Sequence, residues 1–350
     1  MKNVVIRVDA SLSIGTGHVM RCLTLAGKLS KQGKKVFFVT RDWPGNMAAH
    51  IREKEYPVSL LPALHGASSQ SELQLAAEAW QEDAAETGKC IEGLQLDTED
   101  ILLVVDHYAL DEKWERALRP MVRKIMVIDD LANRPHDCDI LLDQNYYKNM
   151  EGRYQGLVPP HCRLKLGPKY ALLREEFYHA RKKLKVRDGV VRHLFIFFGG
   201  SDPTQETMKA LRAVERLNRP DLSVDVVVGV SNPHRAEIER FCNRLSSALF
   251  HCQVDNMAEL MAGADLAIGA GGTAIWERCF LGLPSLVIAV AENQVETVKA
   301  LAEAGVVVYL GQHDQVSVER ITDALQQLMG DPRRLVELSR RGIGMIEGTL

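Results

Sequence analysis

One stretch near the N-terminus decides the fold: residues 4–18 read VVIRVDASLSIGTGH. The stretch begins as an apolar strand, turns through glycines at positions 15 and 17, and ends on His18, where a helical pattern starts. Glycine lets the backbone adopt positive φ and approach a ligand closely, and the first amides of a helix attract anions. A strand, a glycine turn and a helix in this order place ligands at the carboxyl edge of a parallel sheet. We therefore expect Gly15 and Gly17 to border a binding site.

His18 ends this stretch, and its position has two interpretations. A histidine at the start of a helix is often structural or merely exposed. However, the positive end of the helix dipole disfavours a protonated ring, so the side chain is expected to be able to accept a proton. Together with the preceding strand, this favours a catalytic role for His18.

The composition excludes several classes of protein. A chain of 350 residues with 46% hydrophobic and 25% charged residues is typical of a globular enzyme and long enough for two domains. A net charge of -3 argues against a nucleic-acid binder. Arg7 and Asp9 interrupt the first apolar run, and no run reaches the length of a membrane span, so we expect neither a signal peptide nor a membrane partner. Seven scattered cysteines without a C-x-x-C pair favour reduced thiols and a cytoplasmic location.

Short β-rich runs alternate with helical patterns along most of the chain, which is typical of parallel sheets. We expect strands near residues 4–8, 36–40, 58–61, 101–106, 124–128, 140–142, 193–198, 224–230, 248–251, 266–269, 285–290 and 306–310, and one helix over residues 71–86. The alternation is interrupted over residues 146–191, a stretch rich in proline, glycine and basic residues. We predict an α/β fold of two Rossmann-like domains, residues 1–160 and 191–330, joined by a linker over 161–190 and facing each other across a ligand-binding cleft. The glycine-rich end, residues 342–350, is expected to lack a final helix and to leave the chain short there.

Polar side chains follow two neighbouring strands of the first half. Asp106, His107 and Tyr108 come directly after a buried strand, at the edge of the sheet where ligands bind. The alternative for Asp106 is a cap on the next helix. Asp129 and Asp130 end the following strand with the same ambiguity. Paired aspartates can hold a divalent cation, but no further ligand pattern accompanies them, so we predict no metal site.

Two further segments border the second half of the chain. Arg174 could bind a carboxylate or phosphate with both nitrogens of its guanidinium group, or pair with the neighbouring acidic residues. Residues 199–203 read GGSDP and predict a helix start with Asp202 as cap and Pro203 in the first turn. This segment matches neither of the usual glycine-rich nucleotide fingerprints.

A second junction of strand, glycines and helix lies at residues 269–277, which read GAGGTAIWE. The free amides of Gly272 and Thr273 could hold a diphosphate, and Glu277, one turn into the helix, could accept hydrogen bonds from ribose hydroxyls. The alternative for Glu277 is to complement the helix dipole. Asn293 and Gln294 follow the next strand, where they could contact a ligand or simply cap a helix.

Several segments in a fixed order resemble a known family. They are IGTGHVMR at 14–21, VVDHY at 104–108, IDD at 128–130, YALLREEF at 170–177, FGGSD at 198–202, GGTAIWE at 271–277 and ENQ at 292–294. This order is similar to that of the UDP-sugar hydrolases of the pseudaminic acid pathway, and the resemblance runs from residue 3 to about residue 310. It implies a glycosyltransferase-B type fold and hydrolysis of UDP-2,4-diacetamido-2,4,6-trideoxy-β-L-altropyranose, with no cofactor or metal. We expect such a chain to be a monomer.

The resemblance also implies a role for each matching residue. His18 would act as general base on the attacking water, and Tyr108 would lie near the sugar. Arg174 would contact the substrate, and Glu277 would bind the uridine ribose. Asn293 and Gln294 would reach the sugar or its phosphate. Attack at the anomeric carbon with inversion is expected, and attack at phosphorus is the alternative. Two other functions stay open: a UDP-sugar-dependent glycosyltransferase, in which His18 deprotonates an acceptor hydroxyl, and a non-enzymatic nucleotide-sugar binding protein.

Overall fold

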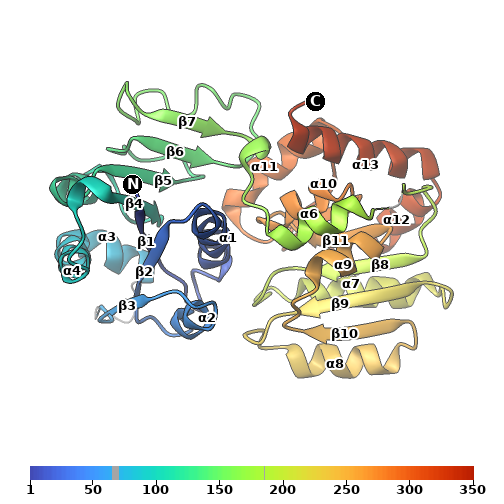
Figure 1. The fold of residues 1–350 in the computed structure, drawn as a ribbon. Coiled ribbons are helices and arrows are strands. Elements are labelled where there is room, and N and C mark those ends of the chain that lie inside the picture. The colour runs from blue at the N-terminus through green and yellow to red at the C-terminus, as the bar shows by residue number, and fades with distance from the viewer. Residues whose placement is uncertain (65–70, 185) are drawn as a thin grey trace. The chain divides into compact units, whose positions relative to one another are not determined.

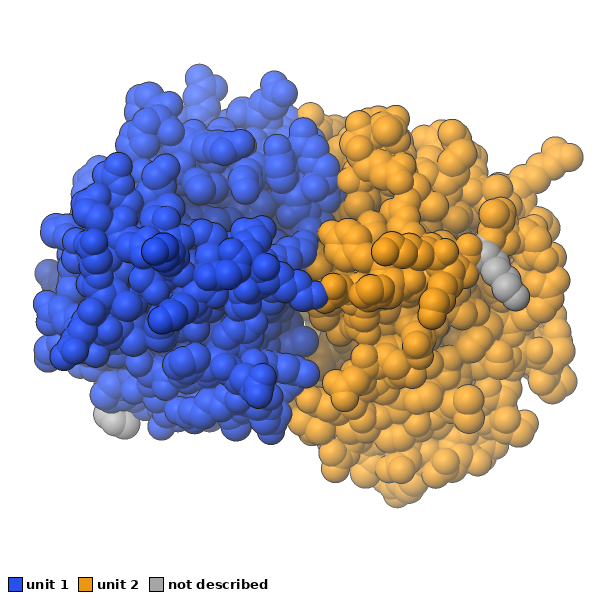
Figure 2. Space-filling view, viewed as in Figure 1, with its two compact units in different colours: residues 1–145, 149–172 blue, residues 146–148, 173–350 orange. Residues whose placement is uncertain are grey.

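The computed structural model describes residues 1–64, 71–184 and 186–350, so that Lys185 of the predicted linker lies outside the described residues. The chain divides into two compact units. Unit 1 comprises residues 1–145 and 149–172, and unit 2 comprises residues 146–148 and 173–350; Figure 2 shows them in blue and orange. Each unit is built on one parallel sheet flanked by helices (Figure 1). The prediction of two Rossmann-like α/β domains is therefore confirmed.

Unit 1 contains a seven-stranded sheet in the order β3-β2-β1-β4-β5-β6-β7. Its elements are β1 (Asn3–Val8), α1 (Gly17–Lys31), β2 (Lys35–Arg41), α2 (Ala48–Glu53), β3 (Val58–Leu61), α3 (Glu72–Glu78), α4 (Trp80–Gly93), η1 (Thr98–Asp100), β4 (Ile101–Asp106), α5 (Glu112–Leu118), η2 (Arg119–Met121), β5 (Lys124–Ile128), β6 (Ile140–Asp143), β7 (Arg163–Leu166) and η3 (Pro168–Tyr170). The sheet order reverses between β1 and β4, which pair directly. Ligands of open α/β sheets bind at such a switch point, beyond the carboxyl ends of the two strands.

The core of unit 1 forms on both faces of this sheet, because successive side chains of a strand point to opposite sides. Ile6 of β1 packs in one buried cluster with Val19 of α1, whereas Val5 packs in another with Trp114 of α5. Both faces of the central strands are thus covered by helices, which explains why β4 is apolar on both faces from Ile101 to Val105.

Unit 2 repeats this plan with a six-stranded sheet in the order β10-β9-β8-β11-β12-β13. Its elements are α6 (Glu175–Lys182), β8 (His193–Phe197), α7 (Glu206–Leu217), β9 (Ser223–Val228), α8 (Arg235–Arg244), β10 (Ala248–Cys252), α9 (Met257–Gly263), β11 (Leu266–Ala270), α10 (Ala274–Phe280), β12 (Ser285–Ala289), α11 (Glu292–Glu303), β13 (Val308–Gln312), α12 (Val318–Met329) and α13 (Pro332–Glu347). Its switch point lies between β8 and β11, which are paired neighbours. The glycine junctions at residues 199–200 and 271–272 follow these two strands.

Three segments differ from the sequence-based expectations. Residues 71–86 form two helices instead of one, because Ala79 leaves the helical conformation with φ -92° and ψ 23°. The predicted linker is divided between the units: residues 163–166 pair with β6 as the edge strand β7, and residues 175–182 form α6 in unit 2. Pro203 is not in the first turn of a helix, since α7 begins only at Glu206. Asp202 still caps α7, accepting hydrogen bonds from the backbone N–H groups of Glu206 and Thr207 at 3.0 and 2.9 Å.

The glycine-rich end is helical, contrary to the expectation that it lacks a final helix. Residues 342–347 belong to α13, whose apolar side chains Leu335, Leu338 and Met345 are buried. Gly342 faces α10, where a Cβ atom would lie in ordinary van der Waals contact, 3.4 Å from the Cα of Cys279. The gain from burying this apolar face outweighs the low helix propensity of glycine.

No helix among the described residues is both long enough and apolar enough to cross a bilayer.

Candidate active site

The turn between β1 and α1 is closed by its own backbone. The N–H of Gly15 donates to the carbonyl of Ser11 at 2.9 Å, and the Ser11 hydroxyl accepts from the N–H of Ile14 at 2.9 Å. Gly15 has a φ of 81°, a conformation that favours glycine. Gly17 does not share the positive φ expected for it, because it is already the first residue of α1. The turn therefore places His18 in the first turn of the helix.

His18 is held by Asp106, which ends the neighbouring central strand β4. The distance between His18 Nδ1 and Asp106 Oδ1 is 2.6 Å. Arg21, three residues further along α1, donates from Nε to Oδ2 and from Nη2 to Oδ1 of the same carboxylate, both at 2.6 Å. All three side chains are buried. The capping alternative for Asp106 does not apply, since α5 is capped by Asp111.

The charge of Asp106 determines which ring nitrogen of His18 carries hydrogen. Burial alone would raise the pKa of Asp106, but Arg21 and His18 together hold it well below its usual range. An ionised carboxylate only accepts hydrogen bonds, so Nδ1 carries the hydrogen when the ring has a single one. Nη2 of Arg21 also lies 3.1 Å from Nδ1, but its shorter contact of 2.6 Å is the one to Asp106. The other nitrogen, Nε2, then has a lone pair and can take a proton. This contact therefore leaves Nε2 of His18 as the ring nitrogen that can accept a proton.

Tyr108 and Asp130 complete this cluster. The rings of Tyr108 and His18 meet edge to face, with centroids 4.5 Å apart and an interplanar angle of 83°. Asp130 accepts a hydrogen bond from Nη1 of Arg21 at 2.9 Å. Burial raises the pKa of the Tyr108 hydroxyl, and the neighbouring Asp130 raises it further, so this hydroxyl stays protonated. Its hydrogen bond to Asp130 holds the Tyr108 hydroxyl within this cluster.

A second buried network of charges fixes the start of the turn. Arg7 of β1 contacts both Asp9 and Asp83 of α4. Asp9 also accepts from the backbone N–H of Arg41 at 2.8 Å and from Nε2 of His107 at 3.1 Å. Burial alone would raise the pKa of Asp9, but Arg7 and His107 hold it well below its usual value. This network ties the ends of β1, β2 and β4 to α4, so the turn that carries His18 starts from a rigid base.

In unit 2, Arg174 and Glu277 are paired with each other, although both were expected to bind the substrate. Arg174 donates from Nε to Oε1 of Glu277 at 2.9 Å, and its Nη1 lies 2.7 Å from Oε1 of Glu176. Arg174 precedes α6, and Glu277 lies in α10, one turn after the glycine junction. Burial would lower the pKa of Arg174, but Glu277 and Glu176 raise it, so the guanidinium stays charged. The pair fixes the position of the Glu277 carboxylate.

The glycine junction of unit 2 lies close to α11. A Cβ atom at Gly271 would lie 2.3 Å from Cγ2 of Val298, so a side chain there would force α11 to move or Val298 to change rotamer. A Cβ atom at Gly272 would lie 3.6 Å from Nε2 of Gln294, whose Oε1 accepts from the N–H of Val290 at 3.1 Å. Gln294 and Asn293 lie in the first turn of α11. Thr273 is the N-cap of α10, and its side chain makes no capping hydrogen bond.

The structure thus brings together His18, Asp106 and Tyr108 in unit 1, and Arg174 with Glu277 in unit 2. Sequence reasoning did not single out Arg21 as a site residue, and it left Asp130 undecided between a site residue and a helix cap. A signal for Arg21 was present, because residues three apart lie on the same face of a helix and Arg21 follows His18 at this spacing.

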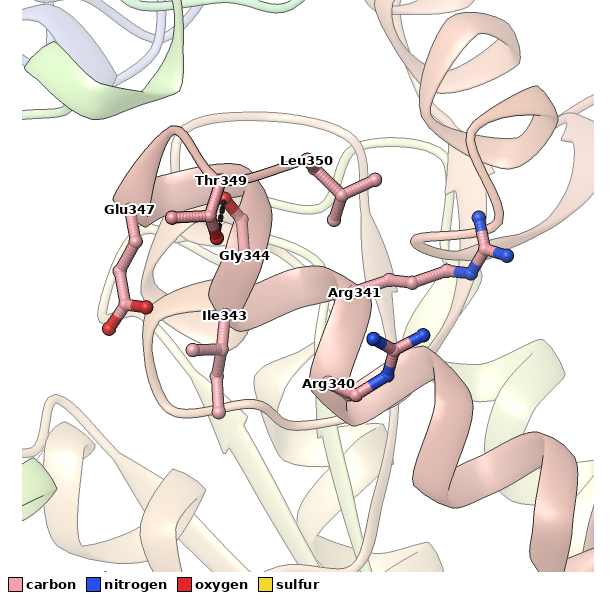
Figure 3. A pocket seen from close by; sticks show the side chains of 7 residues that line it. All are labelled: Arg340, Arg341, Ile343, Gly344, Glu347, Thr349 and Leu350. Carbon is pink, nitrogen blue, oxygen red and sulfur yellow. Dashed lines mark hydrogen bonds between the residues drawn. The ribbon is translucent and has the colours of Figure 1, made fainter.

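A separate cavity of about 340 Å³ lies at the end of α13. Figure 3 shows its lining, which includes the side chains of Arg340, Arg341 and Glu347. All of its lining residues fall within residues 340–350, and none of the expected site residues is among them. The cavity therefore does not help to locate the active site.

Known proteins resemble this chain in sequence. Residues 194–344 match the glycosyltransferase family 28 C-terminal domain. The chain is 29% identical over 303 residues to UDP-2,4-diacetamido-2,4,6-trideoxy-beta-L-altropyranose hydrolase of Campylobacter jejuni. This alignment covers 86% of this chain and 97% of that protein. The chain is also 25% identical over 348 residues to the spore coat polysaccharide biosynthesis protein SpsG of Bacillus subtilis. That alignment covers 99% of this chain and 94% of SpsG. The resemblance expected from the ordered motifs is confirmed.

A solved structure is similar along nearly the whole chain. The crystal structure of Acinetobacter baumannii MurG matches with a TM-score of 0.63 at 13% identity, covering 99% of this chain and 98% of that one. At this identity the similarity shows the fold alone. The fold is of the glycosyltransferase-B type, as the motifs had implied.

Proposed function

We propose that this chain hydrolyses a UDP-sugar, with His18 activating the attacking water. The observation that carries the proposal is the hydrogen bond between His18 Nδ1 and Asp106, because it leaves Nε2 as a proton acceptor at the functional edge of the sheet. Similarity to the C. jejuni hydrolase supports this class of reaction.

The proposed reaction needs one proton acceptor and a bound leaving group. Nε2 of His18 takes a proton from water while the water oxygen attacks the anomeric carbon. The bond between this carbon and the diphosphate oxygen breaks, and UDP leaves with the bonding electrons. Asp106 stabilises the imidazolium that forms, as a carboxylate does in comparable pairs. We propose inversion at carbon, and attack at phosphorus is the alternative that the experiment below distinguishes.

We propose that unit 2 supplies the nucleotide contacts, because the matched family domain lies within this unit. The proposed contacts are the amides of Gly272 and Thr273 with the diphosphate, Glu277 with the ribose hydroxyls, and Arg174, Asn293 and Gln294 with the sugar or its phosphate. Preorganised donors of this kind stabilise the charge that develops on a leaving group. In unit 1, Gly15, Gly17 and Tyr108 would border the sugar.

The finer assignments follow the resemblance. We propose UDP-2,4-diacetamido-2,4,6-trideoxy-β-L-altropyranose as substrate, and a role in pseudaminic acid biosynthesis, on the basis of the similarity to the C. jejuni protein. A monomeric state and a cytoplasmic location are predictions from the sequence.

Incubation of the full chain with this UDP-sugar alone, in oxygen-18 water, tests the proposal. We expect UDP release without an acceptor and oxygen-18 in the sugar, whereas label in UDP would indicate attack at phosphorus. His18→Asn should lower turnover by roughly 100-fold or more while UDP binding persists. The matched control is His50→Asn, because His50 lies on α2 and pairs with Glu53 instead. Unchanged turnover in the His18 variant would remove the base role.

A second candidate is a glycosyltransferase, which the match to the family 28 domain favours. In that case UDP release from the sugar nucleotide would depend strictly on an added acceptor. A binding protein without activity would retain UDP affinity and release no UDP under either condition. The same incubation therefore separates the three functions.

A further inference from the structure

Two cysteines of unit 1 lie in contact although they are distant in sequence. The Sγ atoms of Cys138 and Cys162 are 3.5 Å apart. Cys138 precedes β6 and Cys162 precedes β7, and these two strands pair in parallel. Both thiols therefore lie where the chain enters neighbouring strands, in segments without regular secondary structure.

The backbone around both cysteines is anchored. Asp139, next to Cys138, accepts from the backbone N–H of Arg163 at 2.9 Å through its carbonyl. The backbone N–H of Cys162 donates to Pro159 at 2.9 Å. These bonds keep the two thiols together in the folded chain. A small movement would bring the Sγ atoms from 3.5 Å to the S–S length of a disulfide, about 2.05 Å.

The two thiols differ in access. Cys138 is fully buried, whereas Cys162 is partly exposed and can meet a small oxidant from solvent. Reactive thiols are accessible ones, and a buried neighbour within contact can resolve the oxidised sulfur before it reacts further. The pair thus has the arrangement of an attacking and a resolving cysteine.

We propose that Cys138 and Cys162 form a reversible disulfide when the protein meets hydrogen peroxide. In the first step the thiolate of Cys162 attacks one peroxide oxygen, the O–O bond breaks, and hydroxide leaves, which gives a sulfenic acid. In the second step the sulfur of Cys138 attacks Sγ of Cys162, the S–O bond breaks, and water leaves as Cys138 loses its proton. Two thiols are oxidised by two electrons, and one peroxide is reduced to two waters.

The electrostatics agree with this division of roles. The hydrogen bond to Cys162, with burial added, raises the pKa of Cys138, so Cys138 keeps its proton. The hydrogen bond from Cys138 lowers the pKa of Cys162 against the effect of burial. These directions agree with the role of attacking sulfur that the exposure of Cys162 assigns to it.

The disulfide would connect the edge strand β7 covalently to β6. Each strand is short, and within the described part of the chain β7 pairs only with β6. A cross-link at their entry would restrain the segment through which the chain runs into unit 2 after residue 172. This modification does not depend on the proposed hydrolase activity.

Peptide mapping after peroxide treatment tests the proposal on the intact chain. Trypsin separates the two cysteines into residues 125–148 and 154–163, each with a single cysteine, because Arg134 is followed by proline. We expect these two peptides to be linked, with a loss of about 2 Da from their summed mass. Treatment with dithiothreitol should separate them again.

Three variants complete the test. Cys162→Ser and Cys138→Ser should both abolish the linked species, and Cys162→Ser is expected to fold because its side chain is partly exposed. Cys90→Ser is the matched control, since Cys90 is another half-buried thiol of unit 1 and should leave the link unchanged. Unlinked peptides after peroxide treatment of folded protein, or sulfinic acid on Cys162 in place of the link, would overturn the proposal.

Discussion

His18 and Asp106 lie 2.6 Å apart, Nδ1 to Oδ1, although 88 residues separate them in sequence. The contact exists because β1 and β4 are adjacent at the switch point of the sheet, so the segments that follow them meet. Arg21 binds both oxygens of the same carboxylate and thereby fixes its plane. The imidazole orientation thus depends on a carboxylate that is itself held by a guanidinium group.

Replacement of Asp106 by Asn should therefore impair turnover more than binding. An amide can donate to Nδ1, which would put the ring hydrogen on Nε2 and remove the proton acceptor. We expect turnover of the UDP-sugar to fall by roughly 100-fold or more, with the affinity for UDP within about twofold of wild type. Steady-state kinetics and calorimetric titration with UDP measure the two quantities.

The control for this variant is Asp111→Asn, which lies five residues away and caps α5. Asn caps helices about as well as Asp, so this change should leave both activity and stability near wild type. Equal losses in the two variants, or normal turnover in the Asp106 variant, would contradict the role assigned to Asp106.

Glu277→Gln should weaken nucleotide binding through the ribose. Arg174 holds Oε1 of Glu277 at 2.9 Å, so the carboxylate is positioned before any ligand arrives. Loss of its charge should weaken UDP binding roughly tenfold, as expected for hydrogen bonds to a charged group. Titration with UDP and with 2′,3′-dideoxy-UDP measures how much of the loss depends on the ribose hydroxyls.

If Glu277 binds the ribose, the variant should discriminate less between these two ligands than wild type does. Glu337→Gln, on the outer face of α13, is the control and should change neither affinity. Full discrimination retained in the Glu277 variant would indicate that this carboxylate only holds Arg174.

Much of the fold could be predicted because its strands are buried on both faces. Continuous apolar runs such as residues 101–106 gave the strand limits directly, and glycine junctions marked the helix starts that follow. The edge strand β7 was missed because its four residues alternate between charged and apolar side chains within a stretch rich in turn residues. Helix α13 was missed because glycine has a low helix propensity, whereas the burial of Leu335, Leu338 and Met345 that outweighs it depends on tertiary packing.

Local sequence could place single residues at the edge of a sheet, but it could not predict which of them pair. His18 and Asp106 were each placed at the carboxyl edge from local sequence, yet neither spacing nor composition shows that they share a hydrogen bond. The same holds for Arg174 and Glu277, which were expected to contact substrate and turn out to contact each other. Pairings of this kind depend on the strand order, which a single sequence does not contain.

Asp143 makes the stability of unit 1 depend on pH. Burial raises the pKa of Asp143 from 3.8 to about 7, and the neighbouring Asp130 contributes to the shift. Below about pH 4 this carboxyl is protonated in both states, so it has no effect. Between about pH 4 and 7 the unfolded chain loses the proton and the folded chain keeps it, so stability falls as pH rises. Above about pH 7 the cost is constant, at most about 4 kcal/mol.

Asp143→Asn should remove this cost, because the amide oxygen can still accept from the N–H of Asn145. We expect the variant to exceed wild type in the free energy of unfolding at pH 8 and to match it near pH 4, measured by urea titration. Asp97→Asn, at an exposed cap of η1, should follow the wild-type profile. A difference between Asp143→Asn and wild type that is the same at both pH values would show that the titration of Asp143 does not cause it.

Gly271→Ala tests whether this glycine serves packing or ligand contact. The added Cβ would lie 2.3 Å from Cγ2 of the fully buried Val298, so α11 must move or Val298 must change rotamer. We expect a loss of roughly 1–3 kcal/mol in the free energy of unfolding. Gly263→Ala is the control, because a Cβ at that position meets no atom within 4 Å.

The double variant Gly271→Ala/Val298→Ala should be more stable than the sum of the single changes predicts, by about 1 kcal/mol or more. Strict additivity would mean that packing against Val298 does not require this glycine, and a loss of UDP affinity without a loss of stability would assign it to the ligand.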